Sequence, residues 1–324
     1  MKIKYTVVVL FIFLLSCTGN DEKKLPEKGF VSWLPASTWE DALLSGNGTL
    51  GAMVMGYPFE EKIIVNHALL YLPNEAPLVP PNMAVHLDKI RKLSFDGKWG
   101  EAAKLGVKIW EDAGYGPKKW TDPYVPAADI NISMPATNVS DYQRSVNFET
   151  AEASVDWTDE NGEFSRKTFV SRADGVIVTQ ITGSGAINAV IDFGKHPHSW
   201  EQNSFVNSLI AKSETKILEE GLLQYHCEYA KPHSHSPKGY NGVLKIITKG
   251  GNIKGLGNKL SVSEASEVII ITSIEPFYKE SAQNSDSLKY KVNAINADYN
   301  YLLERQKQTH GENLQSNEFE SLSF

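Results

Sequence analysis

A succession of short strand-like segments, each closed by a turn signal, constrains the fold of this chain more than any other feature. The clearest segments lie at 142–150, 151–157, 164–171 and 176–182. Polar and apolar residues alternate along them, which indicates half-buried strands because successive side chains of a strand point to opposite faces. Many short strands in succession predict an antiparallel sheet rather than alternating strands and helices.

Strand-like runs continue to residue 273, and together they predict a mainly β fold, an antiparallel β-sandwich. The later runs are 187–193, 222–229, 243–248, 259–262 and 268–273. Between two of the strands, the Gly-Ser-Gly sequence at 183–185 predicts a turn. Near the start, Gly46-Asn47-Gly48 predicts a hairpin turn, because Asn-Gly accepts the positive φ that such turns require.

Two stretches show helical spacing instead. Apolar residues between 85 and 113 predict a small helical insertion, and we expect its Trp99 and Trp110 to pack against the sheet. A second apolar stripe predicts one C-terminal linker helix that ends near Gln308, and this stripe must either fold back on the sandwich or stay exposed. The stripe consists of Leu288, Val292, Ile295, Tyr299 and Leu302.

The N-terminus resembles the export signal of a bacterial lipoprotein. Two lysines precede an apolar run over 6–15, which at about 10 residues is too short to span a bilayer as a helix. The following LLSC sequence resembles a lipobox, whose Cys becomes the lipidated first residue. We therefore expect 1–17 to be a lipoprotein signal peptide, Cys17 to carry the lipid, and 18–29 to be a polar tether. The alternative is an ordinary signal peptide with an incidental Cys.

Net charge limits the partners that an exported form of this chain can have. The formal charge of −7 becomes −9 once Lys2 and Lys4 are removed. A negative protein is a poor match for nucleic acid or anionic headgroups, so we expect no nucleic-acid partner and membrane contact through the lipid anchor only. Neutral glycans remain compatible. With Cys17 acylated, Cys227 is the one thiol left, so an internal disulfide cannot form.

Three segments resemble glycoside hydrolase family 95, the family of inverting α-L-fucosidases. Residues 44–54, which read LSGNGTLGAMV, resemble the opening of that family. Residues 141–151, DYQRSVNFETA, resemble its Asp-Tyr-x-Arg run, and residues 164–171, FSRKTFVS, resemble its Phe-x-Arg-Glu-x-Phe-x-Ser strand. The chain departs at His67 and Tyr71, where the family has Glu and Trp.

The resemblance implies a domain organisation and an activity. It implies that 30–284 form the family's N-terminal β-sandwich, of the supersandwich type, and that 285–324 form its linker helix and a truncated tail. In the family, the general acid and the Asn-assisted water-activating apparatus lie in an (α/α)6 barrel, and their motifs have no counterpart here. We therefore predict no catalytic residue, no metal and no cofactor.

Three functional hypotheses follow from this resemblance. In the first, the chain is the N-terminal domain of an exported enzyme that hydrolyses terminal α-L-fucosides of glycans, and it is inactive without a separately encoded catalytic barrel. In the second, the sandwich is a surface module that binds fucosylated glycans without catalysis. In the third, the chain is a decayed fragment.

Four residues are candidates for contact with a glycan or for burial in a domain interface. Trp120 and Trp200 lie in loop-like surroundings, and an indole face packs well on a sugar ring. Asn66 and His67 lie on the stretch from Trp39 to Tyr71 that opens the family resemblance, and they could face a ligand cleft.

Other polar clusters favour ordinary structural roles. The adjacent carboxylates Glu60-Glu61 and Glu40-Asp41 point to opposite faces if extended, so we expect them to be solvated charges at strand ends. His196-Pro197-His198 and His233-Ser234-His235 could form a zinc site with Cys227, but loop roles are favoured because such short spacing is common.

The lipid anchor gives a first prediction. Cys17→Ala should release the protein from the membrane fraction, because stable attachment needs the acyl chains that this Cys would carry. Fractionation of cells followed by immunoblotting measures the effect. If the variant stays in the membrane fraction to the same extent as the wild type, the protein is not a lipoprotein.

Overall fold

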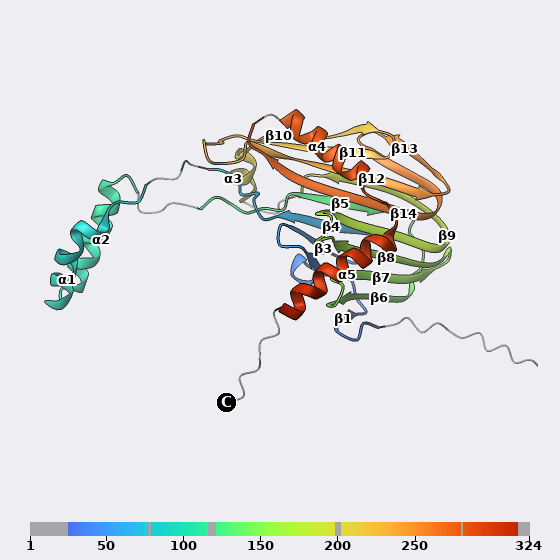
Figure 1. Cartoon of the computed structure of the whole chain (residues 1–324), viewed down its shortest axis with the longest axis horizontal. Helices are drawn as coiled ribbons and strands as arrows, with labels where there is room; N and C mark the ends of the chain where they lie inside the picture. The colour runs from blue at the N-terminus through green and yellow to red at the C-terminus, as the bar shows by residue number, and fades with distance from the viewer. Residues whose placement is uncertain are drawn as a thin grey trace, which may run out of the picture.

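The computed structural model describes residues 25–74, 76, 79–115, 121–197, 202–279 and 281–316. Within these residues, fourteen strands pair in antiparallel fashion (Figure 1). The strands are β1 (Gly29–Ser32), β2 (Leu43–Gly46), β3 (Leu50–Val54), β4 (Glu60–His67), β5 (Ala128–Ser133), β6 (Ser140–Asn147), β7 (Glu152–Asp159), β8 (Gly162–Val170), β9 (Ile177–Gly194), β10 (Ile210–Glu219), β11 (Leu222–Tyr229), β12 (Gly239–Lys249), β13 (Asn252–Leu256) and β14 (Lys259–Phe277). The helices are η1 (Trp39–Asp41), η2 (Met83–His86), α1 (Leu87–Phe95), α2 (Trp99–Asp112), α3 (Gln202–Ser208), α4 (Ser281–Ala294) and α5 (Tyr299–Ser316).

The long strands β9 and β14 belong to both layers of the structure. The first half of β9 pairs with β8, whereas its second half pairs with β5. One layer follows the order β1-β6-β7-β8-β9-β14-β12-β11-β10, and the other continues through β2-β3-β4-β5 to β9, with β13 on β14. The expected antiparallel β-sandwich is confirmed, in the form of one sheet that curls into two layers.

The main core lies between these two layers. Alternate residues of most strands face inward, and the buried set includes Trp157, Phe193, Ile130 and Val65. Burial of this apolar surface is the main favourable term in folding, at about 25 cal/mol per Å². The period of two in the sequence therefore marks the residues that build the core.

The helices α4 and α5 cover the outer face of the longer layer (Figure 1). Outward-facing residues of the sheet, such as Val178 and Ile271, pack in one cluster with the apolar stripe of the helices. The expectation of one continuous helix is wrong, because the helix breaks at 295–298 and Asp298 caps α5 by accepting a 2.9 Å hydrogen bond from the backbone N–H of Tyr301. The stripe folds back on the sandwich and is not exposed.

Polar contacts fix α4 and α5 to the turn between β8 and β9. The Arg305 guanidinium lies 3.0 Å from the Asp174 carboxylate, and the backbone N–H of Arg172 donates a 2.8 Å hydrogen bond to the Gln306 side chain. From α4, the Lys291 ammonium donates to the carbonyl of Gly175 at 2.9 Å. These contacts orient both helices on the sheet.

The expected turn at 183–185 is not a turn, because β9 runs through it without interruption. A Cβ atom on Gly183 would lie 2.5 Å from the Phe164 ring, and one on Gly185 would lie 2.1 Å from the Asn161 carbonyl oxygen. The two glycines therefore allow the neighbouring β7–β8 hairpin to approach closely. By contrast, the turn predicted at Gly46-Asn47-Gly48 is confirmed and joins β2 to β3.

The helical insertion is confirmed as η2, α1 and α2, but its expected packing on the sheet is wrong. The two helices pack on each other, α1 also packs on η2, and Figure 1 shows them away from the sheet. Trp99 is 73% exposed, and Trp110 packs edge-on against Tyr115 rather than on a strand. No helix in the described ranges is long and apolar enough to cross a membrane.

The packing of α4 gives a second prediction. Leu288→Ala should lower the free energy of unfolding by about 2–5 kcal/mol, because it leaves a cavity between helix and sheet where Leu288 is 2% exposed. The matched control is Tyr290→Ala on the same helix, where the side chain is 78% exposed, and it should change stability by less than about 0.5 kcal/mol. Urea denaturation measures both, and equal effects would contradict the packing described.

Candidate functional site

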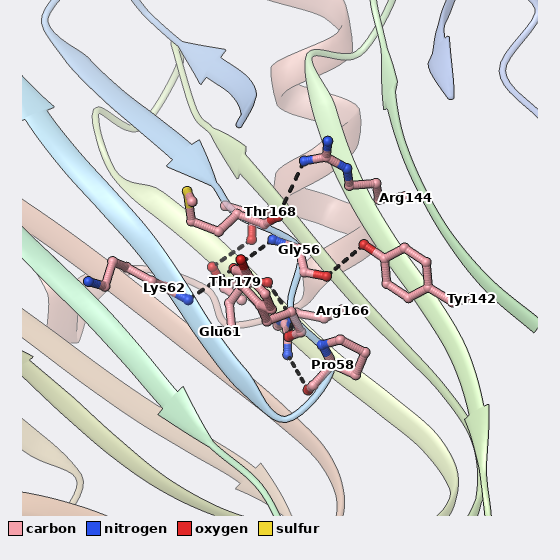
Figure 2. A network of polar contacts seen from close by, with 11 residues as sticks. Gly56, Pro58, Glu61, Lys62, Tyr142, Arg144, Arg166, Thr168 and Thr179 are labelled. Carbon is pink, nitrogen blue, oxygen red and sulfur yellow. Dashed lines mark hydrogen bonds and ion pairs between the residues drawn. The ribbon is translucent and has the colours of Figure 1, made fainter. Parts of the chain in front are cut away.

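A buried ion pair lies in the core, beside the loop that joins β3 to β4 (Figure 2). Glu61 on β4 and Arg166 on β8 form a direct contact, and neither side chain has any solvent exposure. The carboxylate also accepts hydrogen bonds from the backbone N–H groups of Gly56 and Lys62, at 2.9 and 3.0 Å. The charge on Glu61 is therefore fully compensated.

The Arg166 guanidinium holds the loop as well as the carboxylate. It donates to the carbonyl oxygens of Tyr57 and Pro58, at 2.6 and 3.2 Å. Its central carbon lies 5.3 Å from the centroid of the Trp157 ring, within the range of a cation–π interaction. Such a guanidinium satisfies several acceptors in fixed directions, which a lysine cannot do.

Two side chains of β6 fix the same loop from the other side (Figure 2). Arg144 donates to the carbonyl of Met55 at 3.2 Å, and the Tyr142 hydroxyl donates to the carbonyl of Gly56 at 2.6 Å. Gly56 has a φ of +87°, and a Cβ atom there would lie 2.9 Å from both side chains. Burial raises the pKa of the Tyr142 hydroxyl well above its usual range, so it stays a donor.

This network has a structural role rather than a chemical one. An acid or nucleophile must reach its substrate, and the carboxylate of Glu61 has no exposed surface. The expectation that Glu61 is a solvated charge is therefore wrong, because Arg166 compensates it inside the core. The geometric part of that expectation is right, since its neighbour Glu60 is exposed and accepts a 2.7 Å hydrogen bond from Ser133.

The candidate residues Asn66 and His67 lie next to each other at the end of β4. The Asn66 amide is half-buried and lies 3.4 Å from the sulfur of Met53. His67 is 1% exposed, and its Nδ1 accepts a 3.2 Å hydrogen bond from the backbone N–H of Leu69. Burial lowers the pKa of His67, while the Glu275 carboxylate 4.0 Å from Nε2 opposes that shift. In this structure the ring of His67 has almost no surface that a glycan could contact.

The other candidates are placed only in part. Cys17, Trp120 and Trp200 lie outside the described residues. The carboxylates of Glu40 and Asp41 are both exposed, as expected for solvated charges. They lie in η1, so the expectation that they stand at a strand end is wrong.

The histidines do not gather around Cys227 in the part of the chain that the structure describes. His196 Nδ1 lies 2.8 Å from the Asp129 carboxylate, whereas His233 Nδ1 accepts from the backbone N–H of His235. The Cys227 thiol is buried, and this burial raises its pKa to about 12, so it is a poor metal ligand. No group of three metal-binding side chains occurs among the described residues.

The ion pair gives a third prediction. Glu61→Gln should lower the free energy of unfolding by about 3–5 kcal/mol, because it leaves the buried Arg166 without a counter-charge. Glu60→Gln is the matched control at the adjacent exposed position and should change stability by less than about 0.5 kcal/mol. Urea denaturation, monitored by tryptophan fluorescence, measures the free energy of unfolding of both variants. A stable Glu61→Gln protein would show that the pair does not hold the fold.

Comparison with known proteins identifies the domain. The chain is 25% identical over 288 residues to Alpha-L-fucosidase 2 from Arabidopsis thaliana, covering 82% of this chain and 33% of that protein. The chain thus spans one third of the length of this relative. A putative kojibiose phosphorylase from the human microbiome has a similar fold, with a TM-score of 0.53 and 9% identity over 89% of this chain and 39% of that chain.

A family model provides the assignment. It is described as "Glycosyl hydrolase family 65, N-terminal domain" and matches residues 32–281. The expectation of a glycoside hydrolase N-terminal domain is confirmed, although the model carries the number 65 where the sequence resemblance named family 95. By these matches, the chain belongs to the family of glycosyl hydrolase family 65 N-terminal domains.

Proposed function

We propose that this chain is the non-catalytic N-terminal domain of an α-L-fucosidase-type glycoside hydrolase, and that fucoside hydrolysis needs a catalytic domain outside it. The observation that carries the proposal is the match to Alpha-L-fucosidase 2, of which this chain spans only 33%. The resemblance to family 95 assigns the acid and the water-activating group to a helical barrel. The fully compensated state of the buried Glu61 agrees with a scaffold role.

An apolar hollow on the surface supports association with a catalytic domain. The apolar hollow has a volume of about 560 Å³. Its lining includes Phe30, Leu44 and Phe148, which are 50%, 62% and 54% exposed. Contiguous exposed apolar side chains of this kind favour contact with another protein surface.

The hollow lies beside α5. His310 on α5 lines it, and its Nε2 lies 3.0 Å from the carbonyl oxygen of Phe148. The stripe on α4 and α5 is already buried on the sheet, so it does not provide a surface for a partner. We therefore assign the contact with a catalytic barrel, whether joined to this chain or separately encoded, to the apolar hollow.

We also propose that the protein is exported and held at a bacterial membrane, in the periplasm or at the cell surface, by a lipid on Cys17. The resemblance of 14–17 to a lipobox supports this location. A role as a surface glycan-binding module is the second candidate, and the polar groove described below favours it. A decayed fragment is the third candidate, and the mutually compensated contacts around Arg166 favour a folded domain over it.

The fourth prediction is that the purified chain does not hydrolyse aryl or oligosaccharide α-L-fucosides. General acid–base catalysis alone contributes about 10²–10⁴-fold to the rate of an enzyme, and the resemblance to family 95 places the groups for it in the barrel. The assay compares the chain alone with the chain mixed with any barrel protein that is encoded next to it. Activity of the chain alone, abolished by changing a residue within it, would overturn the proposal.

The mixture also tests the docking surface. Leu44→Asp places a charge in the apolar hollow and should abolish both binding of the barrel protein and any gain in activity. Leu256→Asp on β13 is the matched control, because Leu256 is also exposed, at 54% against 62% for Leu44, but does not line the hollow. If both variants bind the barrel protein like the wild type, the hollow is not the docking surface.

A further inference from the structure

A polar groove of about 450 Å³ lies on the outer face of the sheet, between α4 and the edge strand β10. The strands β10 and β11 form one side of it, and α4 forms the other. Its lining includes Glu214, Lys216, Gln224, His226, Asp286 and Lys289. The cross-strand pairs Glu214 with His226 and Lys216 with Gln224 set these side chains in rows across the sheet. Directly opposed side chains of this kind have Cβ atoms about 4.5–5.5 Å apart.

The floor of the groove is rigid and made of hydrogen-bonding groups. His226 is 9% exposed, with Nδ1 at 2.7 Å from the Asn241 side-chain oxygen and Nε2 at 2.9 Å from the Glu228 carboxylate. The imidazole stacks on the Phe277 ring with an angle of 8° between the planes. Asn241 in turn donates to Asn284 on α4 at 2.9 Å, which connects the floor to the helix.

The lysines that line the groove pair with carboxylates. The carboxylate of Glu214 accepts from Lys212 at 2.8 Å and from Lys216 at 2.7 Å, and these hydrogen bonds hold the pKa of Glu214 at about 2. At one end, the Lys289 ammonium pairs with Glu219 at 2.9 Å. With three lysines already paired, the groove has little excess charge for a phosphate or carboxylate ligand.

A solvated edge strand is the simplest alternative explanation. Charged side chains on β10 would prevent pairing with another sheet, and this accounts for Lys212 and Lys216. It does not account for Gln224 and Glu228 on β11, which is not an edge strand, nor for Asp286 on α4. The lining contains three lysines and three carboxylates, so it has no net formal charge. Polar side chains from a strand and a helix with balanced charge suit a ligand that offers many neutral hydroxyl groups.

We propose that this groove binds a neutral saccharide, with Gln224, Glu228 and Asp286 as the hydrogen-bonding groups and His226 as the floor. The amide of Gln224 donates one N–H to the Asn241 side-chain oxygen at 3.2 Å, which leaves its second N–H and its oxygen for a ligand. The carboxylates of Glu228 and Asp286 can accept from sugar hydroxyls. Both walls contribute, because Asp286 comes from α4 and the others come from β11. This binding site goes beyond the proposed scaffold role, gives the second candidate function of glycan binding a location, and does not depend on a catalytic domain.

The fifth prediction tests this binding site by calorimetric titration of the purified chain with 2′-fucosyllactose, maltotriose and cellotriose. At least one of these neutral probes should bind saturably. Gln224→Ala and Asp286→Ala, from opposite walls, should each weaken that binding about three- to tenfold, as expected for loss of one or two hydrogen bonds. Thermal unfolding of each variant checks that the fold is kept.

The matched control is Gln143→Ala on β6, which removes the same side chain from a different groove and should leave binding unchanged. Sialyllactose, which adds a carboxylate, should bind no better than the neutral probes. The proposal fails if none of the neutral probes binds, if Gln143→Ala weakens binding as much as Gln224→Ala, or if sialyllactose binds most tightly. None of these results bears on fucoside hydrolysis, so the two proposals fail independently.

Discussion

The contact between Glu61 and Arg166 is the interaction on which the rest of the structure depends. Glu61 comes from the layer that contains β4, and Arg166 comes from β8 in the other layer, so their pairing connects the two layers through the core. A buried charge without its partner is strongly unfavourable, so the pair tolerates only one arrangement of these strands. A shift of β4 by one residue would bring Glu60 inward and expose the carboxylate that Arg166 needs.

Much of the fold could be predicted from the sequence, because the alternation of polar and apolar residues records which side chains face the core. The strands around 142–182 and the turn at Gly46-Asn47-Gly48 follow from this pattern and from turn chemistry. The Gly-Ser-Gly sequence at 183–185 predicted a turn that the structure does not have. Glycine occurs both in turns and where neighbouring strands approach closely, and only the position of Phe164 distinguishes the two cases. The strand β10 carries so many charged residues that its alternation is not visible in the sequence.

The polar network and the groove were harder to predict. Arg144 and Arg166 both occur in the segments that resemble family 95, and each stands at an inward-facing position of a strand. An arginine at such a position signals a buried partner, but nothing in the sequence identifies that partner as Glu61, which lies 105 residues away. The groove depends on the placement of α4 against β11, which is a tertiary contact that local spacing does not record.

The sharing of β9 and β14 between the two layers has a consequence for how this domain can recognise anything. Layers that are joined by continuous strands cannot open like a clamshell or slide past each other, because such a motion would break the pairing of both strands at once. A rigid surface loses little conformational entropy when a ligand arrives. We therefore expect this domain to bind through a preorganised surface, whose selectivity comes from a shape that exists before the ligand binds.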